Sequence, residues 1–143
     1  MSLPNSVFVD TSFFIALLNS SDTDHTRALE LQLQLSEANP RKVTSEYVLM
    51  ELGDGLSRLR FRPLAIKLLA LVHADPSFEI VASSTEWFAR AVALFQNRAD
   101  KDWGLTDCSS FAIMHHMGIV AALTADRHFQ QAGYVALLLE QEL

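Results

Sequence analysis

Short runs of apolar and β-branched residues recur along the chain and are separated by longer, more polar stretches. Such runs predict buried β-strands. The run at 119–123 is continuous and apolar, which is typical of a strand covered on both faces of a parallel sheet. The strands that we expect cover residues 7–9, 42–44, 78–81, 119–123 and 135–139.

Between the predicted strands, apolar residues stand three or four positions apart, which predicts amphipathic helices. A helix is also expected at 23–38, where leucines at 29, 31, 33 and 35 are mixed with Arg, Glu and Gln, and Asn39-Pro40 ends it. In the next helix, 45–59, one face carries the apolar residues at 48, 52, 56 and 59. Further helices are expected at 64–73 and at about 106–117. Another helix is expected to begin at Ser83-Ser84-Thr85-Glu86, which has the spacing of a capping box, and to end at Phe95.

The alternation of strands and helices predicts an α/β protein with a mostly parallel sheet covered on both faces. With 143 residues, the chain is long enough for one ordinary core, and no composition shift or repeat divides it. We therefore expect a single domain over residues 1–143.

Composition and charge narrow the functional classes. Half of the residues are hydrophobic and the formal net charge is −6, which argues against a general coat for nucleic acid but not against an enzyme that acts on RNA. Cys108 is the only cysteine, so no internal disulfide can form. The apolar stretch at 13–18 is too short to span a bilayer. We expect a cytoplasmic protein without a membrane partner.

Acidic residues follow two of the predicted strands. Asp10 comes directly after the first strand, where the pattern changes to a turn or a helix start, and Asp126 follows the strand at 119–123. Ligands of an open parallel sheet bind beyond the carboxyl ends of its strands. Asp107 stands where a helix begins, a position that favours an ionised carboxylate. We expect all three in one crevice, although each has an ordinary alternative as a turn or helix-cap residue.

Glu51 is a fourth candidate, because it flanks the apolar stripe of the helix at 45–59, whereas Glu46 falls on the opposite, polar side. The pattern alone leaves the role of Glu51 open. Carboxylates that converge in a shielded site either take up protons or bind a cation. Oxygen ligands suit Mg²⁺ and Mn²⁺, and such ions can activate water for attack on a phosphodiester.

Four segments of the chain resemble the PIN domain, the nuclease fold of the VapC toxins of toxin–antitoxin pairs. They are VFVDTS at 7–12, EYVLMEL at 46–52, LTDCS at 105–109 and LTADRHF at 123–129. The resemblance implies a three-layer α/β/α sandwich and Mg²⁺- or Mn²⁺-dependent cleavage of RNA. It assigns both metal binding and catalysis to Asp10, Glu51, Asp107 and Asp126.

The resemblance also implies partners. It suggests a homodimer and a small antitoxin protein whose segment lies across the acidic cleft, with a basic side chain in the place of the metal. The leucine-rich helices between Ser45 and His73 offer a groove for such a segment. Possible accessory residues are Thr11, Ser12, Asp102 and Arg127.

Several alternatives remain open at this point. The protein could be a housekeeping RNA-processing enzyme, or a PIN-like module that binds RNA or protein without cutting. The five histidines lack a metal-motif spacing, so His128 is interpreted as an ordinary residue that approaches the site. Cys108 is interpreted as a packing residue. Arg58, Arg60 and Arg62 are either a solvated helix end or a contact for RNA phosphate.

Overall fold

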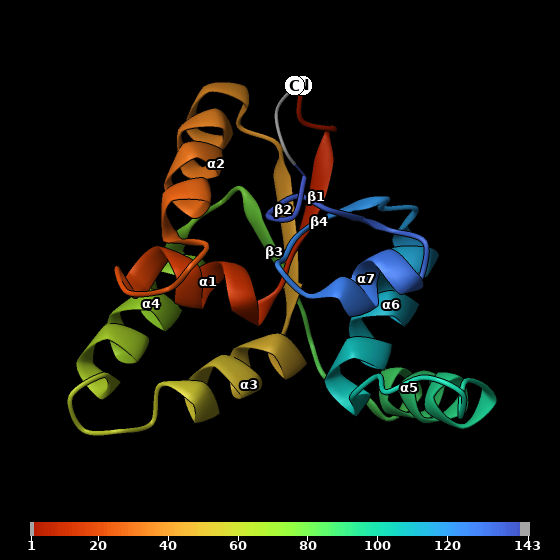
Figure 1. Cartoon of the computed structure of the whole chain (residues 1–143). Helices are drawn as coiled ribbons and strands as arrows, with labels where there is room; N and C mark the ends of the chain where they lie inside the picture. Colours follow the sequence, from red (N-terminus) through yellow and green to blue (C-terminus); the bar gives the residue numbers. More distant parts are fainter. Residues whose placement is uncertain (1, 141–143) are drawn as a thin grey trace.

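A parallel sheet forms the middle layer of the computed structural model, which describes residues 2–140 (Figure 1). Its strand order is β3-β2-β1-β4-β5, and every neighbouring pair is parallel. The strands are β1 (Ser6–Val9), β2 (Arg41–Ser45), β3 (Phe78–Val81), β4 (Ala121–Leu123) and β5 (Val135–Ala136). All of the predicted strands are present, although β4 and β5 are shorter than their apolar runs.

Helices cover both faces of this sheet. Figure 1 shows α1, α2 and α4 on one side, α6 and α7 on the other with α5 beside α6, and α3 beyond the carboxyl ends of the strands. The predicted α/β class and three-layer sandwich are confirmed. The helices are α1 (Thr11–Leu18), α2 (His25–Ala38), α3 (Glu46–Gly55), α4 (Arg62–Ala74), α5 (Thr85–Asn97), α6 (Leu105–Met117) and α7 (Arg127–Gln131).

The central strand has neighbours from distant parts of the chain. β1 pairs with β2 on one side and with β4 on the other, with Val9 in register with Leu123. Val7, Phe8 and Val9 have no exposed surface, because helices cover both faces of the sheet. The strand order reverses between β1 and β4, and a crevice outside the carboxyl ends of strands forms at such a point.

Aromatic contacts fix the helices that border this crevice. The rings of Phe111 in α6 and Phe129 in α7 meet edge to face, with centroids 4.9 Å apart. Trp103 packs edge to face on Phe111 at 5.0 Å, and its indole N–H donates to Gln131 in α7. The two helices therefore hold fixed positions beside β4.

Two local predictions were wrong by a few residues. The helix predicted for 45–59 ends at Gly55, and Leu59 lies beyond it with 86% of its surface exposed, so its apolar spacing was coincidental. The N-cap of α5 is Ser84, not Ser83: its Oγ accepts from the backbone N–H of Trp87. Glu86 therefore closes no capping box and instead pairs with Arg90 at 2.7 Å.

α6 ends at Met117 and is capped by Gly118, whose φ of +68° lies in the left-handed region that glycine adopts without strain. The longest described helix, α2, has 14 residues, and no helix within residues 2–140 is long and apolar enough for a bilayer crossing.

Candidate active site

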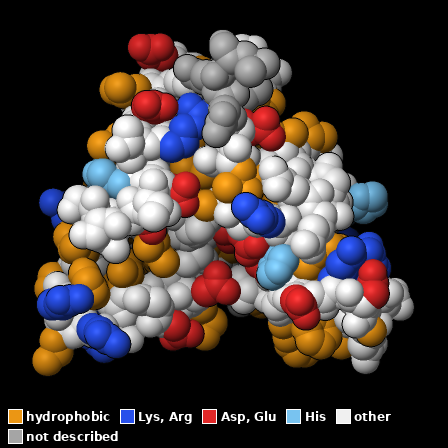
Figure 2. All heavy atoms as spheres, in the orientation of Figure 1, with side chains coloured by type: hydrophobic (Ala, Val, Ile, Leu, Met, Phe, Trp, Pro, Cys, Tyr) orange, Lys and Arg blue, Asp and Glu red, His pale blue; other side chains and the backbone are white. Residues whose placement is uncertain are grey.

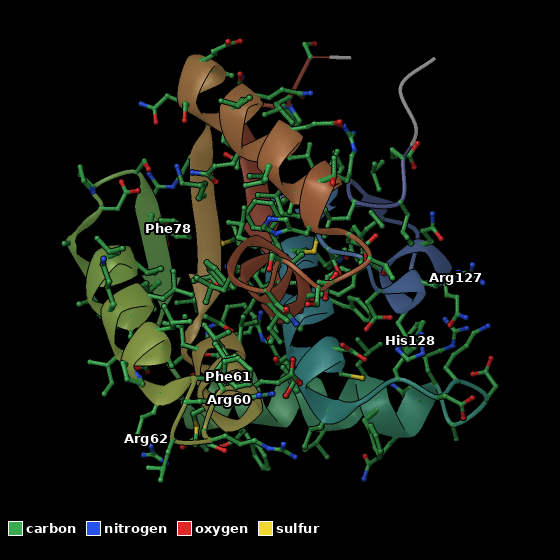
Figure 3. All side chains as sticks on the ribbon, turned by 60° about the vertical axis from the view of Figure 1, so that its left-hand side comes forward. Arg60, Phe61, Arg62, Phe78, Arg127 and His128 are labelled. Atoms are coloured by element: carbon green, nitrogen blue, oxygen red, sulfur yellow. The ribbon has the colours of Figure 1, made fainter. Side chains whose placement is uncertain are left out.

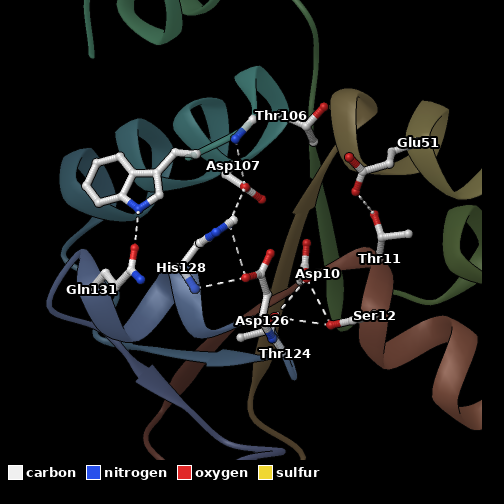
Figure 4. Close-up of polar contacts among 12 residues, drawn as sticks. Asp10, Thr11, Ser12, Glu51, Thr106, Asp107, Thr124, Asp126, His128 and Gln131 are labelled. Carbon is white, nitrogen blue, oxygen red and sulfur yellow. Dashed lines mark hydrogen bonds and ion pairs between the residues drawn. The ribbon is translucent and has the colours of Figure 1, made fainter. Parts of the chain in front are cut away.

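The four predicted acidic residues surround the carboxyl edge of the sheet where β1 and β4 end (Figure 4). Asp10 directly follows β1, and Asp126 is the N-cap residue of α7 beyond β4. Asp107 lies in the first turn of α6, and Glu51 lies in α3. Figure 2 shows acidic side chains gathered in a hollow in the middle of this face. The geometry thus brings the candidates to one place without testing their chemical roles.

Asp10 is held by two hydroxyl groups. Thr124 Oγ1 and Ser12 Oγ donate to the same carboxyl oxygen, Oδ2, at 2.8 and 3.0 Å. Each hydroxyl in turn accepts a backbone N–H, that of Asp126 for Thr124 and that of Ala125 for Ser12. Because each hydroxyl oxygen accepts a hydrogen bond from a backbone N–H, its own proton points toward Asp10. The two hydroxyl groups therefore fix the orientation of the Asp10 carboxyl.

Burial makes Asp10 an unusual carboxyl group. Only 4% of the residue is exposed, and this burial raises the pKa of Asp10 to about 6. The hydrogen bonds from Thr124 and Ser12 oppose the shift, and the nearby charge of Asp107 adds to it. A negative charge at Asp10 is therefore costly unless a cation neutralises it.

Asp107, Asp126 and His128 form the tightest group in the crevice. One ligand atom from each lies within 4.8 Å of the others, and this is the only such group within residues 2–140. His128 Nδ1 is 3.1 Å from Asp107 Oδ2 and 3.3 Å from Asp126 Oδ1. Asp107 Oδ2 also accepts the backbone N–H of Gly104, the N-cap residue of α6. Asp107 is thus the third residue of its helix and not the cap itself.

The electrostatics of this group fit a cation. Burial raises the pKa of Asp107, and the neighbouring Asp126 raises it further. Hydrogen bonds from Gly104 and His128 only partly offset these causes. A divalent ion would relieve the desolvation and the repulsion at the same time. The donor set, mainly carboxylate oxygens, suits Mg²⁺ or Mn²⁺.

Glu51 forms the opposite wall of the crevice. It is exposed, and its Oε1 accepts a hydrogen bond of 2.7 Å from the hydroxyl of Thr11, the first residue of α1. Thr11 immediately follows Asp10, so this bond ties α3 to the end of β1. Glu51 therefore belongs to the same crevice but stands outside the group formed by Asp107, Asp126 and His128.

The remaining candidate residues are either exposed or buried in the core. Asp102 is exposed ahead of α6, and Cys108 is buried in the core, as expected for a packing residue. Arg127 is exposed, and Figure 3 shows it extending outward from α7. Arg58 and Arg60 lie between α3 and α4, where Arg60 covers the ring of Phe61 at 4.5 Å, and Arg62 is the first residue of α4. The prediction that this arginine group forms a helix C-terminus was therefore wrong.

Sequence reasoning undervalued two residues. His128 was treated as an ordinary neighbour of Asp126, and Thr124 was not singled out. Their partners lie 21 and 114 positions away along the chain, at Asp107 and Asp10, so no local spacing could show these contacts. The signal in the sequence was the segment 124–128 itself, which places a hydroxyl, a carboxylate and an imidazole at alternate positions.

Comparison with known proteins identifies the family. The family profile described as the PIN domain matches residues 7–134. The chain belongs to the PIN-domain family. The resemblance seen in the four sequence segments is thereby confirmed, including the likeness to VapC proteins.

A curated PIN-domain relative is the 23S rRNA-specific endonuclease VapC20 of Mycobacterium tuberculosis. It is 30% identical over 135 residues, which cover 90% of this chain and 95% of the relative. The crystal structure of VapC20, described as a toxin that cleaves the sarcin–ricin loop, matches with a TM-score of 0.79 and 28% identity. That match covers 90% of this chain and 96% of the solved one.

Two more distant structures share the PIN fold. VapBC2 of Rickettsia felis, solved with a DNA fragment from its promoter, matches with a TM-score of 0.63 and 17% identity over 92% of this chain and 96% of that chain. FitAcB of Neisseria gonorrhoeae matches with a TM-score of 0.59 and 18% identity over 91% of this chain and 94% of that chain. At these identities the likeness shows the fold alone.

Proposed function

We propose that this PIN-domain protein is a metal-dependent endoribonuclease and the toxin of a VapBC-type pair. The observation that carries the proposal is the convergence of Asp10, Asp107 and Asp126, which are spread over 116 positions of sequence, at one edge of the sheet. Glu51 completes the proposed set from α3. The likeness to VapC20 over nearly the whole chain supports the same function.

The residues present fit a divalent ion, proposed here as Mg²⁺ or Mn²⁺. Such an ion supplies acidification of an attacking water and stabilisation of the phosphate and the leaving oxygen. Asp10, Asp107 and Asp126 would hold it, with Glu51 on the far wall. The carboxyl of Asp10 cannot turn freely, because Ser12 and Thr124 fix one of its oxygens.

The proposed reaction is hydrolysis of an RNA phosphodiester by water, without a covalent enzyme intermediate. No nucleophilic side chain is needed, and Cys108 is buried in the core. The acidic residues position the reactants and neutralise developing charge through the bound cation. The proposed substrate is a loop of the large ribosomal RNA, by analogy with the printed activity of VapC20.

The antitoxin is proposed to bind beside the crevice. A groove of about 440 Å³ lies between α3 and α4, with apolar walls from Leu49, Met50 and Leu69 and with Glu46 and His73 at its edge. An amphipathic segment fits such a surface. The predicted homodimer is part of the same proposal, supported by the exposed Phe88 and Phe95 on α5. Light scattering after size-exclusion chromatography measures whether the protein is a monomer or a dimer.

The function is tested by incubating ribosomes and total RNA with the purified protein and mapping the new ends. We expect discrete cuts that need Mg²⁺ or Mn²⁺, stop with a chelator, and disappear in Asp126→Asn. The matched control is Asp54→Asn, an exposed residue of α3, which should leave cleavage unchanged. A protein that binds RNA but cuts none under these conditions would instead be a binding module. Growth arrest relieved by a small protein encoded next to the gene would support the toxin role.

A further inference from the structure

The imidazole of His128 faces both carboxylates of the Asp107 and Asp126 pair through a single atom, Nδ1 (Figure 4). We propose that His128 is itself a ligand of the metal ion and biases the site toward Mn²⁺ over Mg²⁺. This inference rests on the proposed metal-dependent nuclease function. It adds a nitrogen donor to a site that the sequence resemblance describes as purely acidic.

The spacing of the donor atoms supports direct binding. Adjacent ligands of an octahedral ion with bonds of about 2.1 Å lie about 3 Å apart. Nδ1 of His128 is 3.1 Å from Asp107 Oδ2 and 3.3 Å from Asp126 Oδ1. An ion that bound both carboxylates would therefore have this nitrogen within its coordination sphere after only a small adjustment.

The backbone holds the imidazole in this place. Asp126 is the N-cap residue of α7, and its Oδ1 accepts the backbone N–H of His128 at 2.8 Å. Phe129, the next residue, has no exposed surface and packs on Phe111 of α6. The helix therefore presents His128 toward Asp107, and the side chain remains half-buried there.

A purely orienting role is the main alternative. A residue that only orients a metal ligand contacts one ligand from the side away from the ion. His128 instead contacts two carboxylates with one nitrogen at the point where they converge. That arrangement is the one expected of a third ligand.

The chemistry of the donors predicts the metal preference. Mg²⁺ favours oxygen ligands and retains its water, whereas an imidazole binds later divalent metals more readily. One nitrogen among carboxylates should raise the affinity for Mn²⁺ more than that for Mg²⁺. The ratio of the two affinities, rather than either value alone, therefore reports on His128.

The test uses Mn²⁺ as both ligand and probe. Electron spin echo spectra of the Mn²⁺-loaded protein detect the ¹⁴N nucleus of a coordinated imidazole. We expect this nitrogen signal in the wild type and in His115→Gln, an exposed histidine of α6, and its loss in His128→Gln. Calorimetric titration should show Mn²⁺ affinity lower by about tenfold or more in His128→Gln, with Mg²⁺ affinity changed much less.

Each outcome decides between the proposals. Mn²⁺ bound to the wild type without a nitrogen signal would overturn the role of His128 and leave the nuclease proposal intact. An equal loss of Mn²⁺ and Mg²⁺ affinity in His128→Gln would likewise reduce the residue to orienting the carboxylates. Failure of the wild type to bind either ion would overturn the metal-dependent function itself. If His128→Gln does not fold, the wild-type echo spectrum still decides.

Discussion

Replacing Asp10 by Asn should make the metal-free protein more stable while it abolishes RNA cleavage. Burial raises the pKa of Asp10 from 3.8 to about 6, which makes its ionisation in the folded state less favourable by about 3 kcal/mol. Because the folded state holds this proton more tightly than the unfolded state, the free energy of unfolding falls as the pH rises from 3.8 to 6. Asn carries no charge and keeps an oxygen that accepts from Ser12 and Thr124.

The assay is thermal unfolding in a chelator between pH 4 and pH 8. At pH 7.5 the variant should melt up to about 10 °C above the wild type, at roughly 3–4 °C per kcal/mol for a domain of this size. The difference should shrink toward pH 4, where Asp10 is protonated in the folded state and close to half-protonated in the unfolded state. Added Mn²⁺ should stabilise the wild type and narrow the gap.

Asp54→Asn, exposed on α3, is the control and should leave the melting temperature unchanged at every pH. The reasoning about desolvation would be refuted by an Asp10→Asn variant that melts below the wild type in chelator at pH 7.5. A stabilisation that stays constant from pH 4 to pH 8 would also refute it, because the charge would then not be the cause.

Substitutions at Thr124, at Gly118 and at the Asp107 and Asp126 pair test other parts of the structure. Thr124→Val removes a buried donor to Asp10, so it should cost about 1–3 kcal/mol in chemical denaturation and raise the pKa of Asp10, as measured by NMR titration. Gly118→Ala should cost about 1–2 kcal/mol without changing cleavage, because its left-handed φ strains any side chain. Asp107→Asn and Asp126→Asn should each lower the cleavage rate by orders of magnitude, and the double variant should be little worse, since ligands of one ion act together; rates that multiply would argue for independent roles.

Local pattern was sufficient for much of the fold. The strand at 78–81 and the helix ends at Ala38 and Met117 matched the structure, because runs of strand-forming residues and stop signals act over a few positions. Local pattern also identified Asp10, because this carboxylate directly follows a predicted buried strand. The errors at Leu59 and Ser83 arose where an apolar or polar residue happened to continue a spacing beyond the true helix end.

The sequence pattern could not show which residues from distant parts of the chain come together in the fold. Pattern made Glu51 a candidate but left its role open, and only the family resemblance assigned it to the site. Its contact with Thr11 depends on how α3 crosses the end of β1. The position of Asp107 as third residue, bonded to Gly104, depends on where α6 begins, which spacing fixed only to within two residues. The meeting of His128 with Asp107 requires both helices to be packed first. Whether the four acidic residues are the catalytic set stays a prediction.

The place of β4 beside β1 has a consequence for biosynthesis. β1 is made before the other strands of the sheet, yet one of its two edges stays unpaired until residues 121–123 have been added, and Asp126 comes after them. The crevice is closed by pairing between segments more than 110 positions apart, which is a late event in folding. A nascent chain therefore lacks the assembled acidic site until β4 and Asp126 have been synthesised. Under the proposed function, cleavage activity arises only after this late stage of synthesis.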